Sequence, residues 1–262
     1  MKRYILPTLL LLSPFFISLS AEAKLKTMNV EYKDGTQVLQ GYLAYDDASK
    51  AKRPGVLIAH EWLGLDKYAK MRTEQLAKLG YVAFAADIYG KGIRPTNTTD
   101  AGKISGQYKA DRDLLRSRIK SGFNVLKNYQ FTDSRRIAAI GYCFGGGAVL
   151  ELARSGQPLN GVVSFHGALD TPDINDAKSI KTKILALNGA EDPYVTAKDV
   201  EAFQNEMKLG KVDWRMVTYG DSVHGFTNPN NGTDKSKGVA YNKNADVRSF
   251  KEMQEFFDEI FK

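Results

Sequence analysis

The chain has 262 residues, of which 43% are hydrophobic, and this is enough for one α/β domain with a full core. Its formal net charge of +7 is spread along the sequence and lacks a basic run with interleaved aromatic residues, so we expect no nucleic-acid binding. With one cysteine the chain cannot form an internal disulfide. We find no repeat, no domain linker and no metal-ligand cluster, and we expect neither a metal ion nor a cofactor.

The N-terminal segment has the pattern of a secretory signal. Lys2 and Arg3 precede an apolar stretch over residues 5–19, and Ala21-Glu22-Ala23 ends it as an A-x-A cleavage site. An uncleaved membrane anchor is the alternative, but the stretch is short and contains two prolines. We therefore expect residues 1–23 to be removed, leaving a single domain of residues 24–262 in the periplasm or outside the cell with no stable membrane anchor.

The rest of the chain alternates between predicted strands and helices. The apolar pattern predicts strands near 28–33, 37–45, 55–60, 81–87, 136–141, 160–166, 182–188 and 213–219, and helices near 66–79, 109–129, 144–155, 196–209 and 245–261. This alternation predicts an α/β fold with a mostly parallel, twisted sheet of about eight strands and helices on both faces. Irregular segments are expected near 89–108 and 225–243, where they follow strand ends and can border a site.

The only cysteine lies in a frame typical of a nucleophile. Gly141-Tyr142-Cys143-Phe144-Gly145 follows an apolar strand and precedes a helix-like segment. A strand, a sharp turn and a helix with the nucleophile at the turn form the nucleophile elbow of α/β-hydrolases, here with sulfur in place of oxygen. The turn is strained, and a side chain at either glycine would collide with its neighbours. The alternative is a buried, inert cysteine, which is the usual state of a free thiol.

A cysteine nucleophile needs a base, and the base needs an acid to orient it. His60 and His166 end apolar runs, whereas His224 lies well downstream of Cys143 in the order nucleophile, acid, histidine. Asp192 follows a predicted strand between Cys143 and His224 and precedes a proline, which disfavours helical geometry. We therefore predict the group Cys143, Asp192 and His224.

Two other carboxylates compete with Asp192 as the acid. Glu191 is its neighbour, and Asp221 lies three residues before His224, where it is expected to shape the loop. Asp192 as a plain turn residue and His224 as a plain loop histidine are the alternatives to a catalytic role.

These segments resemble the dienelactone hydrolase family. The segments that match the family's nucleophile, acid and histidine motifs are Gly-Tyr-Cys-Phe-Gly-Gly-Gly, Gly-Ala-Glu-Asp-Pro and His-Gly-Phe. The chain is also similar to the family in three further segments, at residues 60–65, 86–89 and 240–250. The resemblance spans roughly residues 28 to 262.

The resemblance implies roles for three further residues. Family members use a glutamate after the third strand, here Glu61, to take the thiol proton when substrate binds. Their oxyanion hole is formed by backbone N–H groups, here those of Trp62 and Phe144. The alternative for Glu61 is a helix cap, but Asp66 is better placed to cap the following helix.

The chain departs from the family where the substrate is bound. Dienelactone-cleaving members hold the substrate carboxylate with two arginines, and their positions here are Lys91 and Asn228. Lysine lacks the planar fork of arginine, and asparagine has no charge. Tyr89, Lys91 and Asn228 are the candidate substrate contacts. The next loop contains three basic residues that could bind the carboxylate instead, Arg94, Lys103 and Lys109. We expect these residues to be solvated surface charges.

Together these observations predict a secreted, monomeric hydrolase of small esters or lactones that acts through Cys143, His224 and Asp192 and an acyl-thioester. A thioesterase or general carboxylesterase on the same residues is the alternative within enzymes. A non-catalytic binding protein or a redox-reactive thiol protein is the alternative of another class.

Overall fold

The computed structural model describes Met1 and residues 24–262. The predicted signal segment, except for Met1, lies outside the described residues. Within the described part of the chain, no helix combines the length and apolar character needed to cross a bilayer.

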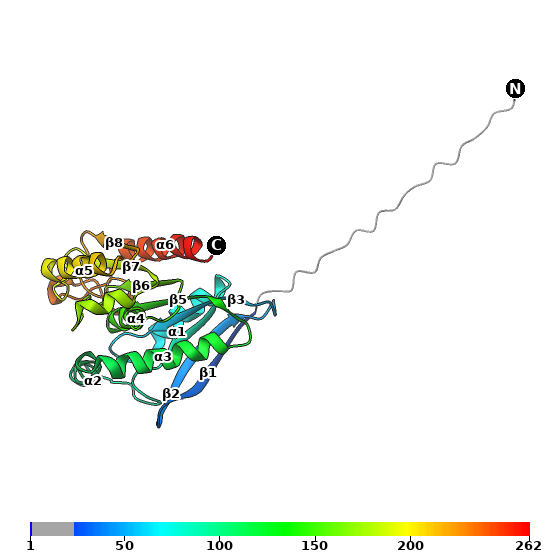
Figure 1. The fold of residues 1–262 in the computed structure, drawn as a ribbon, viewed down its shortest axis with the longest axis horizontal. Coiled ribbons are helices and arrows are strands. Elements are labelled where there is room, and N and C mark those ends of the chain that lie inside the picture. The colour runs from blue at the N-terminus through cyan, green and yellow to red at the C-terminus, as the bar shows by residue number, and fades with distance from the viewer. Residues whose placement is uncertain (2–23) are drawn as a thin grey trace.

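One sheet of eight strands runs through the described domain (Figure 1). Its order is β1-β2-β4-β3-β5-β6-β7-β8, with β1 antiparallel to β2, β2 antiparallel to β4, and every other neighbouring pair parallel. The bounds are β1 Leu25–Asp34, β2 Gln37–Asp46, β3 Arg53–Ala59, β4 Val82–Ala86, β5 Thr132–Tyr142, β6 Gly161–Phe165, β7 Lys183–Gly189 and β8 Trp214–Tyr219. The predicted mostly parallel sheet of about eight strands is confirmed.

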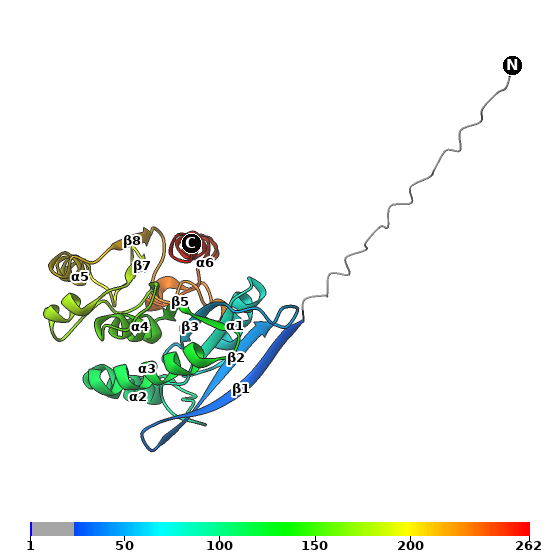
Figure 2. The same cartoon turned by 45° about the vertical axis from the view of Figure 1, so that its right-hand side comes forward.

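Helices cover both faces of this sheet, as Figure 2 shows. Helices α1 and α6 pack on one face, and α3, α4 and α5 pack on the other. The bounds are α1 Lys67–Lys78, α2 Thr98–Ala110, α3 Arg112–Asn128, α4 Phe144–Arg154, α5 Ala197–Gly210 and α6 Lys243–Ile260.

The central strands read as unbroken apolar runs because both of their faces are buried. In β5, Ile137 and Ala139 face the core under α3 and α4, while Ala138 and Ile140 face the core under α1 and α6. All four side chains are fully buried. This double burial fixes the register of β5, since a slip by one residue would exchange its two faces. A rigid β5 is the support on which Cys143 sits.

The predicted irregular segment at 89–108 is wrong in its second half, which forms α2. This helix buries only a narrow stripe of Ala101, Ser105 and Tyr108, so its polar, glycine-containing sequence has little apolar periodicity. Side-chain caps define its limits. Asn97 accepts a hydrogen bond from the Asp100 N–H at the start of α2, and Asp111 accepts one from the Leu114 N–H at the start of α3.

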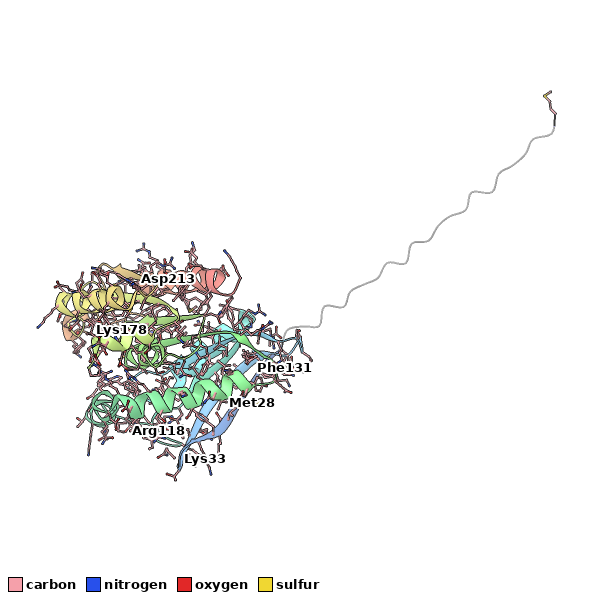
Figure 3. The ribbon with its side chains drawn as sticks, in the orientation of Figure 1. Met28, Lys33, Arg118, Phe131, Lys178 and Asp213 are labelled. Atoms are coloured by element: carbon pink, nitrogen blue, oxygen red, sulfur yellow. The ribbon has the colours of Figure 1, made fainter. Side chains whose placement is uncertain are left out.

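Helix α3 also ties the antiparallel edge of the sheet to the domain. Figure 3 labels Arg118 on α3 and Lys33 near the end of β1. Arg118 forms an ion pair with the neighbouring residue Asp34, with 3.0 Å between Nη1 and Oδ2. The segment at 225–243 is irregular as expected apart from two short 3₁₀ turns, Pro229–Asn231 and Lys235–Lys237.

Candidate active site

The predicted catalytic residues lie at the carboxyl ends of strands on one edge of the sheet. Cys143 follows β5, Asp192 follows β7 and His224 follows β8. Glu61 follows β3, which pairs with β5. Parallel strands bring their carboxyl ends to the same edge, where α/β sheets place their ligands.

Cys143 occupies a strained turn between β5 and α4. Its backbone has φ 54° and ψ −116°, a conformation that side-chain-bearing residues rarely adopt. The flanking glycines allow this turn, because a Cβ on Gly141 would lie 1.9 Å from the Gly145 carbonyl oxygen. A Cβ on Gly145 would lie 2.2 Å from the Ala59 carbonyl oxygen. The turn leaves the Cys143 side chain partly exposed at the end of the strand.

The structure brings Cys143, His224 and Asp192 together in a chain of hydrogen bonds. The distance from His224 Nε2 to Cys143 Sγ is 3.1 Å, and the distance from His224 Nδ1 to Asp192 Oδ2 is 2.9 Å. Asp192 is held in turn by the Tyr194 N–H, which donates to Oδ1 over 2.8 Å. The three side chains have the mutual geometry of a nucleophile, a base and an orienting acid.

The rival carboxylates are engaged elsewhere. The Asp221 N–H donates to Glu191 Oε1 over 3.0 Å, and the Asp221 carboxylate pairs with Lys235. Asp221 also has a positive φ of 59°, as expected of a residue that shapes a loop. Asp192 is therefore the carboxylate that contacts the His224 imidazole.

The charges around His224 favour its protonated form. Burial acts against that form, but a Cys143 thiolate and the hydrogen bond that the imidazole donates to Asp192 outweigh it and raise the pKa of His224 to about 10. An imidazolium that donates to Asp192 through Nδ1 and to sulfur through Nε2 stabilises a thiolate. The protonated imidazole would place an N–H donor 3.1 Å from the Cys143 sulfur.

Glu61 follows β3 and has a neutral hydrogen-bond partner. Asn228 donates from Nδ2 to Glu61 Oε2 over 2.6 Å, and both side chains are buried. Burial raises the pKa of Glu61 to about 7, although the Asn228 hydrogen bond acts in the opposite direction. Among the described residues, the side-chain hydrogen-bond partner of Glu61 is Asn228 and not Cys143. Asp66 caps α1 by accepting from the Ala69 N–H, so Glu61 is not needed as that cap.

The predicted oxyanion-hole residues follow Glu61 and Cys143 directly. Phe144 is the first residue of α4, so its N–H has no acceptor within the helix. The Tyr89 hydroxyl donates to the Trp62 carbonyl over 3.0 Å and thereby fixes the peptide that follows Trp62. Aromatic rings surround this corner, since His60, Tyr89 and Phe144 pack against one another with centroids 4.8 to 6.0 Å apart.

Comparison with known proteins agrees with this geometry. The family model described as the dienelactone hydrolase family matches residues 39–261. The chain belongs to the dienelactone hydrolase family. It is, with that family, a hydrolase, so the predicted family and the prediction of an enzyme are confirmed.

Individual relatives show how far the likeness extends. A dienelactone hydrolase-like promiscuous phosphotriesterase from metagenomic libraries is 36% identical, with a TM-score of 0.87, over 91% of this chain and 99% of that one. Protein usf of Aquifex pyrophilus is 28% identical over 204 residues, which cover 76% of this chain and 86% of that protein. A dienelactone hydrolase from Anabaena variabilis has a TM-score of 0.68 at 17% identity, over 91% and 99% of the two chains, and this shows the shared fold.

At the two positions where the chain was predicted to depart from the dienelactone hydrolase family, neither side chain is free to bind a substrate carboxylate. Asn228 is bound to Glu61, and Lys91 Nζ forms an ion pair of 2.5 Å with Glu31 of β1. The expected solvated character of Arg94 is wrong, because its guanidinium donates to the carbonyls of Leu65, Gly90 and Ile93 and pairs with buried Asp87. Arg94 therefore holds the loops around the site together.

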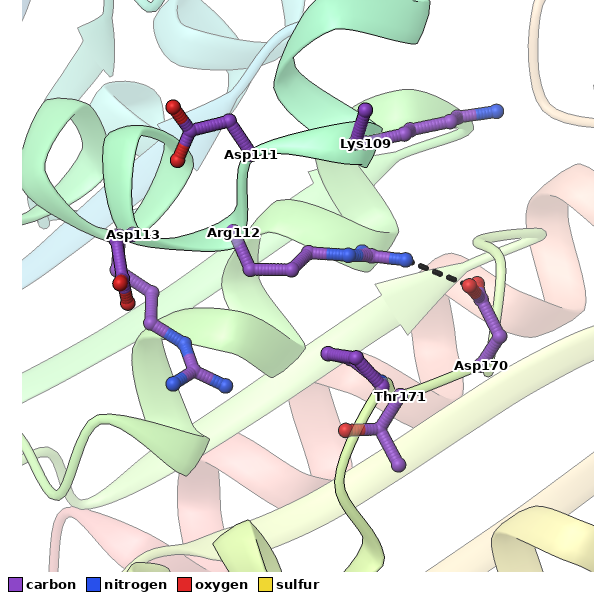
Figure 4. Close-up of a pocket in the computed structure, with 9 residues that line it drawn as sticks. Lys109, Asp111, Arg112, Asp113, Asp170 and Thr171 are labelled. Carbon is purple, nitrogen blue, oxygen red and sulfur yellow. Dashed lines mark hydrogen bonds and ion pairs between the residues drawn. The ribbon is translucent and has the colours of Figure 1, made fainter.

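A separate surface cavity of about 700 Å³ lies at the α2–α3 junction (Figure 4). Its lining comes from residues 109–113, Arg116 and residues 170–172, and it includes none of Cys143, Asp192 and His224. Its arginines are already paired. Arg112 lies 2.6 Å from Asp170, and Figure 4 marks this contact with a dashed line. Arg116 likewise contacts buried Glu151. These charges hold α3 to α4, and they leave the cavity without an unpaired arginine to bind an anion.

Two residues at the site were not singled out from the sequence. The imidazole of His166 lies behind Cys143, where its Nδ1 accepts a hydrogen bond from the Cys143 N–H over 3.1 Å. Tyr194 is 61% exposed and places its ring edge-on to His224, with 5.3 Å between centroids. His166 ends a strand, as His60 does, and only the order of strands in the sheet shows that it adjoins Cys143.

Proposed function

We propose that this chain is an exported hydrolase of small, uncharged esters or lactones, with Cys143 as nucleophile, His224 as base and Asp192 as the acid that orients the base. The hydrogen-bonded chain from Sγ through the imidazole to the carboxylate is the observation that carries this proposal. Family membership supports the class of bond, and the strained turn at Cys143 supports the identity of the nucleophile.

The first half of the reaction forms an acyl-thioester. The Cys143 thiolate attacks the carbonyl carbon, and the resulting oxyanion accepts hydrogen bonds from the backbone N–H groups of Trp62 and Phe144. The C–O bond to the leaving group then breaks, and the imidazolium of His224 gives its Nε2 proton to the departing oxygen. Sulfur is left bonded to the acyl carbon and His224 is left neutral.

The second half returns the enzyme to its starting state. Neutral His224 takes a proton from a water molecule, whose oxygen attacks the thioester carbon. The C–S bond breaks, the acid leaves, and the thiolate is restored beside the imidazolium. Asp192 accepts the Nδ1–H throughout and keeps Nε2 pointed at the reacting atoms. Glu61 is proposed to accept the thiol proton in that fraction of the enzyme in which Cys143 is protonated.

The surroundings of Cys143 favour an uncharged substrate. Partly buried Trp62 and buried Tyr89 and Phe144 give this side of the site an apolar, aromatic character. The side chains at the two clamp positions are engaged with Glu61 and Glu31, so neither offers a substrate carboxylate the bidentate contact of arginine. Tyr89, Lys91 and Asn228 are thus proposed to shape the pocket and not to bind a carboxylate.

Export is proposed on the pattern of residues 1–23 alone. Cleavage would give a mature protein starting near Lys24, in the periplasm or outside the cell. Mass measurement of the protein recovered from each cell fraction tests this, and a full-length chain retained in the cytoplasm would contradict it.

The decisive experiment measures hydrolysis by the purified protein and by Cys143→Ala. Activity on p-nitrophenyl acetate that disappears in the variant supports the proposed function, whereas equal activity in both proteins excludes Cys143 as nucleophile. A panel of neutral lactones, carboxylated lactones, oxygen esters and thioesters then identifies the preferred class. A neutral phosphotriester belongs in the panel because a relative 36% identical to this chain is described as a promiscuous phosphotriesterase. A protein inactive on all of these, with Cys143 still reactive, would favour the redox or binding alternative.

A further inference from the structure

A buried imidazole that the proposed reaction does not use joins the two halves of the catalytic group. His166 follows β6, between the strands that carry Cys143 and Asp192, and it is fully buried. Its Nδ1 accepts the Cys143 N–H over 3.1 Å, so the ring proton is on Nε2. That Nε2–H lies 2.7 Å from Thr227 Oγ1, which accepts it. The imidazole is therefore a neutral bridge with one defined tautomer.

The far end of the bridge belongs to the loop that carries the base. Thr227 comes three residues after His224 and is itself fully buried. Its hydroxyl lies 2.7 Å from the Tyr68 hydroxyl, and its carbonyl accepts from Arg72 over 2.8 Å. Arg72 is paired with Asp246 of α6. The His224 loop is thereby held to α1 and α6, and His166 links this support to the nucleophile.

The backbone at both ends of this contact is strained. Cys143 has φ 54° and His166 has φ 41°. Such conformations persist only where the surrounding structure holds them in place. The Cys143 N–H is held by two acceptors, the Phe165 carbonyl at 3.0 Å and His166 Nδ1 at 3.1 Å. The side-chain acceptor adds to the support that β6 gives the turn.

The surroundings keep His166 neutral. Burial, followed by the charges of His224 and Arg72, holds the pKa of His166 well below its ordinary value. The groups that face its ring from neighbouring elements are His224, Tyr142 and Phe226, with centroids 5.1 to 6.2 Å away. A neutral ring can accept from Cys143 while the nearby His224 carries the positive charge.

We propose that His166 is a positioning residue that fixes the separation of the Cys143 thiolate and the His224 imidazole, by holding the Cys143 backbone at one nitrogen and Thr227 at the other. The inference rests on the proposed roles of Cys143 and His224 in hydrolysis. It matters because a displacement of about 1 Å at a reacting group can cost about 10²-fold in rate. The 3.1 Å contact between Sγ and Nε2 depends on two segments that meet at this ring.

Four variants test the bridge at each of its ends. His166→Leu removes both hydrogen bonds, and His166→Asn keeps an acceptor near the Nδ1 position in a residue that tolerates positive φ. Thr227→Val removes the hydroxyl that accepts from His166, and Thr227→Ser keeps it. For each protein we would measure kcat and KM on p-nitrophenyl acetate, the rate of Cys143 alkylation by iodoacetamide at pH 7, and Tm.

The expected result is a loss of kcat with little change in KM. His166→Leu should lower kcat by about 10- to 100-fold and slow alkylation, with KM within about threefold, because the reacting groups move while the pocket stays. His166→Asn should recover part of the lost kcat. Thr227→Val should lower kcat by about tenfold, and Thr227→Ser should recover most of that loss. If His166→Leu does not fold, the Thr227 pair decides.

A merely structural role would lower Tm alike in the variants and leave kcat and the alkylation rate of the folded protein unchanged, and this would overturn the proposal. A Thr227→Val protein with unchanged kcat would do the same. Cys143→Ala and His224→Ala are measured in parallel to separate this inference from the proposed function. If either keeps hydrolysis, the proposed function fails. If both lose it while the His166 and Thr227 variants keep kcat, only the positioning role fails.

Discussion

The site has a charged side, around His224, and a Glu61 side, and the two differ in how their ionisable group is held. On one side the His224 imidazole donates to a carboxylate, and its pKa is raised to about 10 by the Cys143 and Asp192 charges in spite of burial. On the other side the Glu61 carboxylate has the neutral amide of Asn228 as its partner, and burial raises its pKa to about 7. The charges on the first side favour the protonated imidazole. The second is close to the balance between its two forms, so its charge can respond to what binds.

The largest expected effect comes from removing the carboxylate that accepts the hydrogen bond from His224. Asp192→Asn should lower kcat by at least about 10²-fold, because the imidazole loses both its orientation and the charge that stabilises its protonated form. Asp221→Asn is the matched control and should stay within about tenfold, since Asp221 pairs with Lys235 and shapes the loop. Steady-state kinetics on one neutral ester would measure both. A larger loss of kcat in Asp221→Asn than in Asp192→Asn would show that Asp192 is not the acid.

The next effect concerns the free energy of unfolding, which the buried, ionised Glu61 carboxylate is expected to lower. Between the ordinary value of 4.5 and its folded pKa of about 7, Glu61 binds more protons in the folded chain than in the unfolded chain. The free energy of unfolding should therefore fall as pH rises through that window and stay lowered above it. At about 1.4 kcal/mol per unit, the cost at pH 8 is on the order of 3 kcal/mol.

Glu61→Gln removes this titration and keeps an oxygen that can accept from Asn228. Its free energy of unfolding, relative to the unmodified protein, should be close at pH 4.5 and higher by a few kcal/mol at pH 8. Urea unfolding at the two pH values measures this, with Glu201→Gln on the exposed face of α5 as the control. The same difference at both pH values would show that the carboxyl is not titrating between them.

A third experiment measures the thiolate that the charged side is expected to hold. Near neutral pH only a few per cent of a free thiol is ionised, so a thiolate held by His224 should react about 30-fold faster. We expect iodoacetamide to label Cys143 at about that ratio in folded over unfolded protein at pH 7, and labelling should abolish hydrolysis. His224→Ala should lose the excess rate. Equal rates in folded and unfolded chain would count against built-in activation, and hydrolysis that survives labelling would exclude Cys143 as the nucleophile.

The charged side was easier to predict from the sequence than the Glu61 side. Cys143 is recognisable from the glycines that flank it after a predicted strand. Its partners Asp192 and His224 follow in a fixed chain order at the ends of later strands. The sheet and most helices follow from apolar periodicity. The contact between Glu61 and Asn228 joins positions 167 residues apart. No local pattern encodes it, just as none encodes the bridge from His166 to Thr227. Helix α2 escaped prediction because it buries a narrow stripe and its limits depend on caps.

The smallest effect we expect is a shift of substrate preference when the Glu61 side is changed. Lys91 and Asn228 stand where dienelactone-cleaving relatives are expected to have arginines, and both are engaged with glutamates. The unmodified protein should therefore hydrolyse a neutral lactone at least as well as its carboxylated counterpart. Lys91→Arg combined with Asn228→Arg should shift the ratio of kcat/KM toward the carboxylated substrate by about tenfold, taking about 1.4 kcal/mol for one added charge-assisted contact.

The single variants separate the two positions. Asn228→Arg places a guanidinium beside the buried Glu61 carboxylate, so it should also lower the pKa of Glu61 and move the pH dependence of stability toward acid. Lys91 forms an exposed ion pair with Glu31, so Lys91→Arg should change neither the pKa of Glu61 nor the pH dependence of stability. Measured on a matched pair of lactones, a shift that comes from Asn228→Arg alone would place the substrate carboxylate next to Glu61. A hundredfold preference for the carboxylated lactone in the unmodified protein would instead show that other groups bind it. Lys103 and Lys109 would be tested first, since Arg94 is occupied by the carbonyls of its own loop.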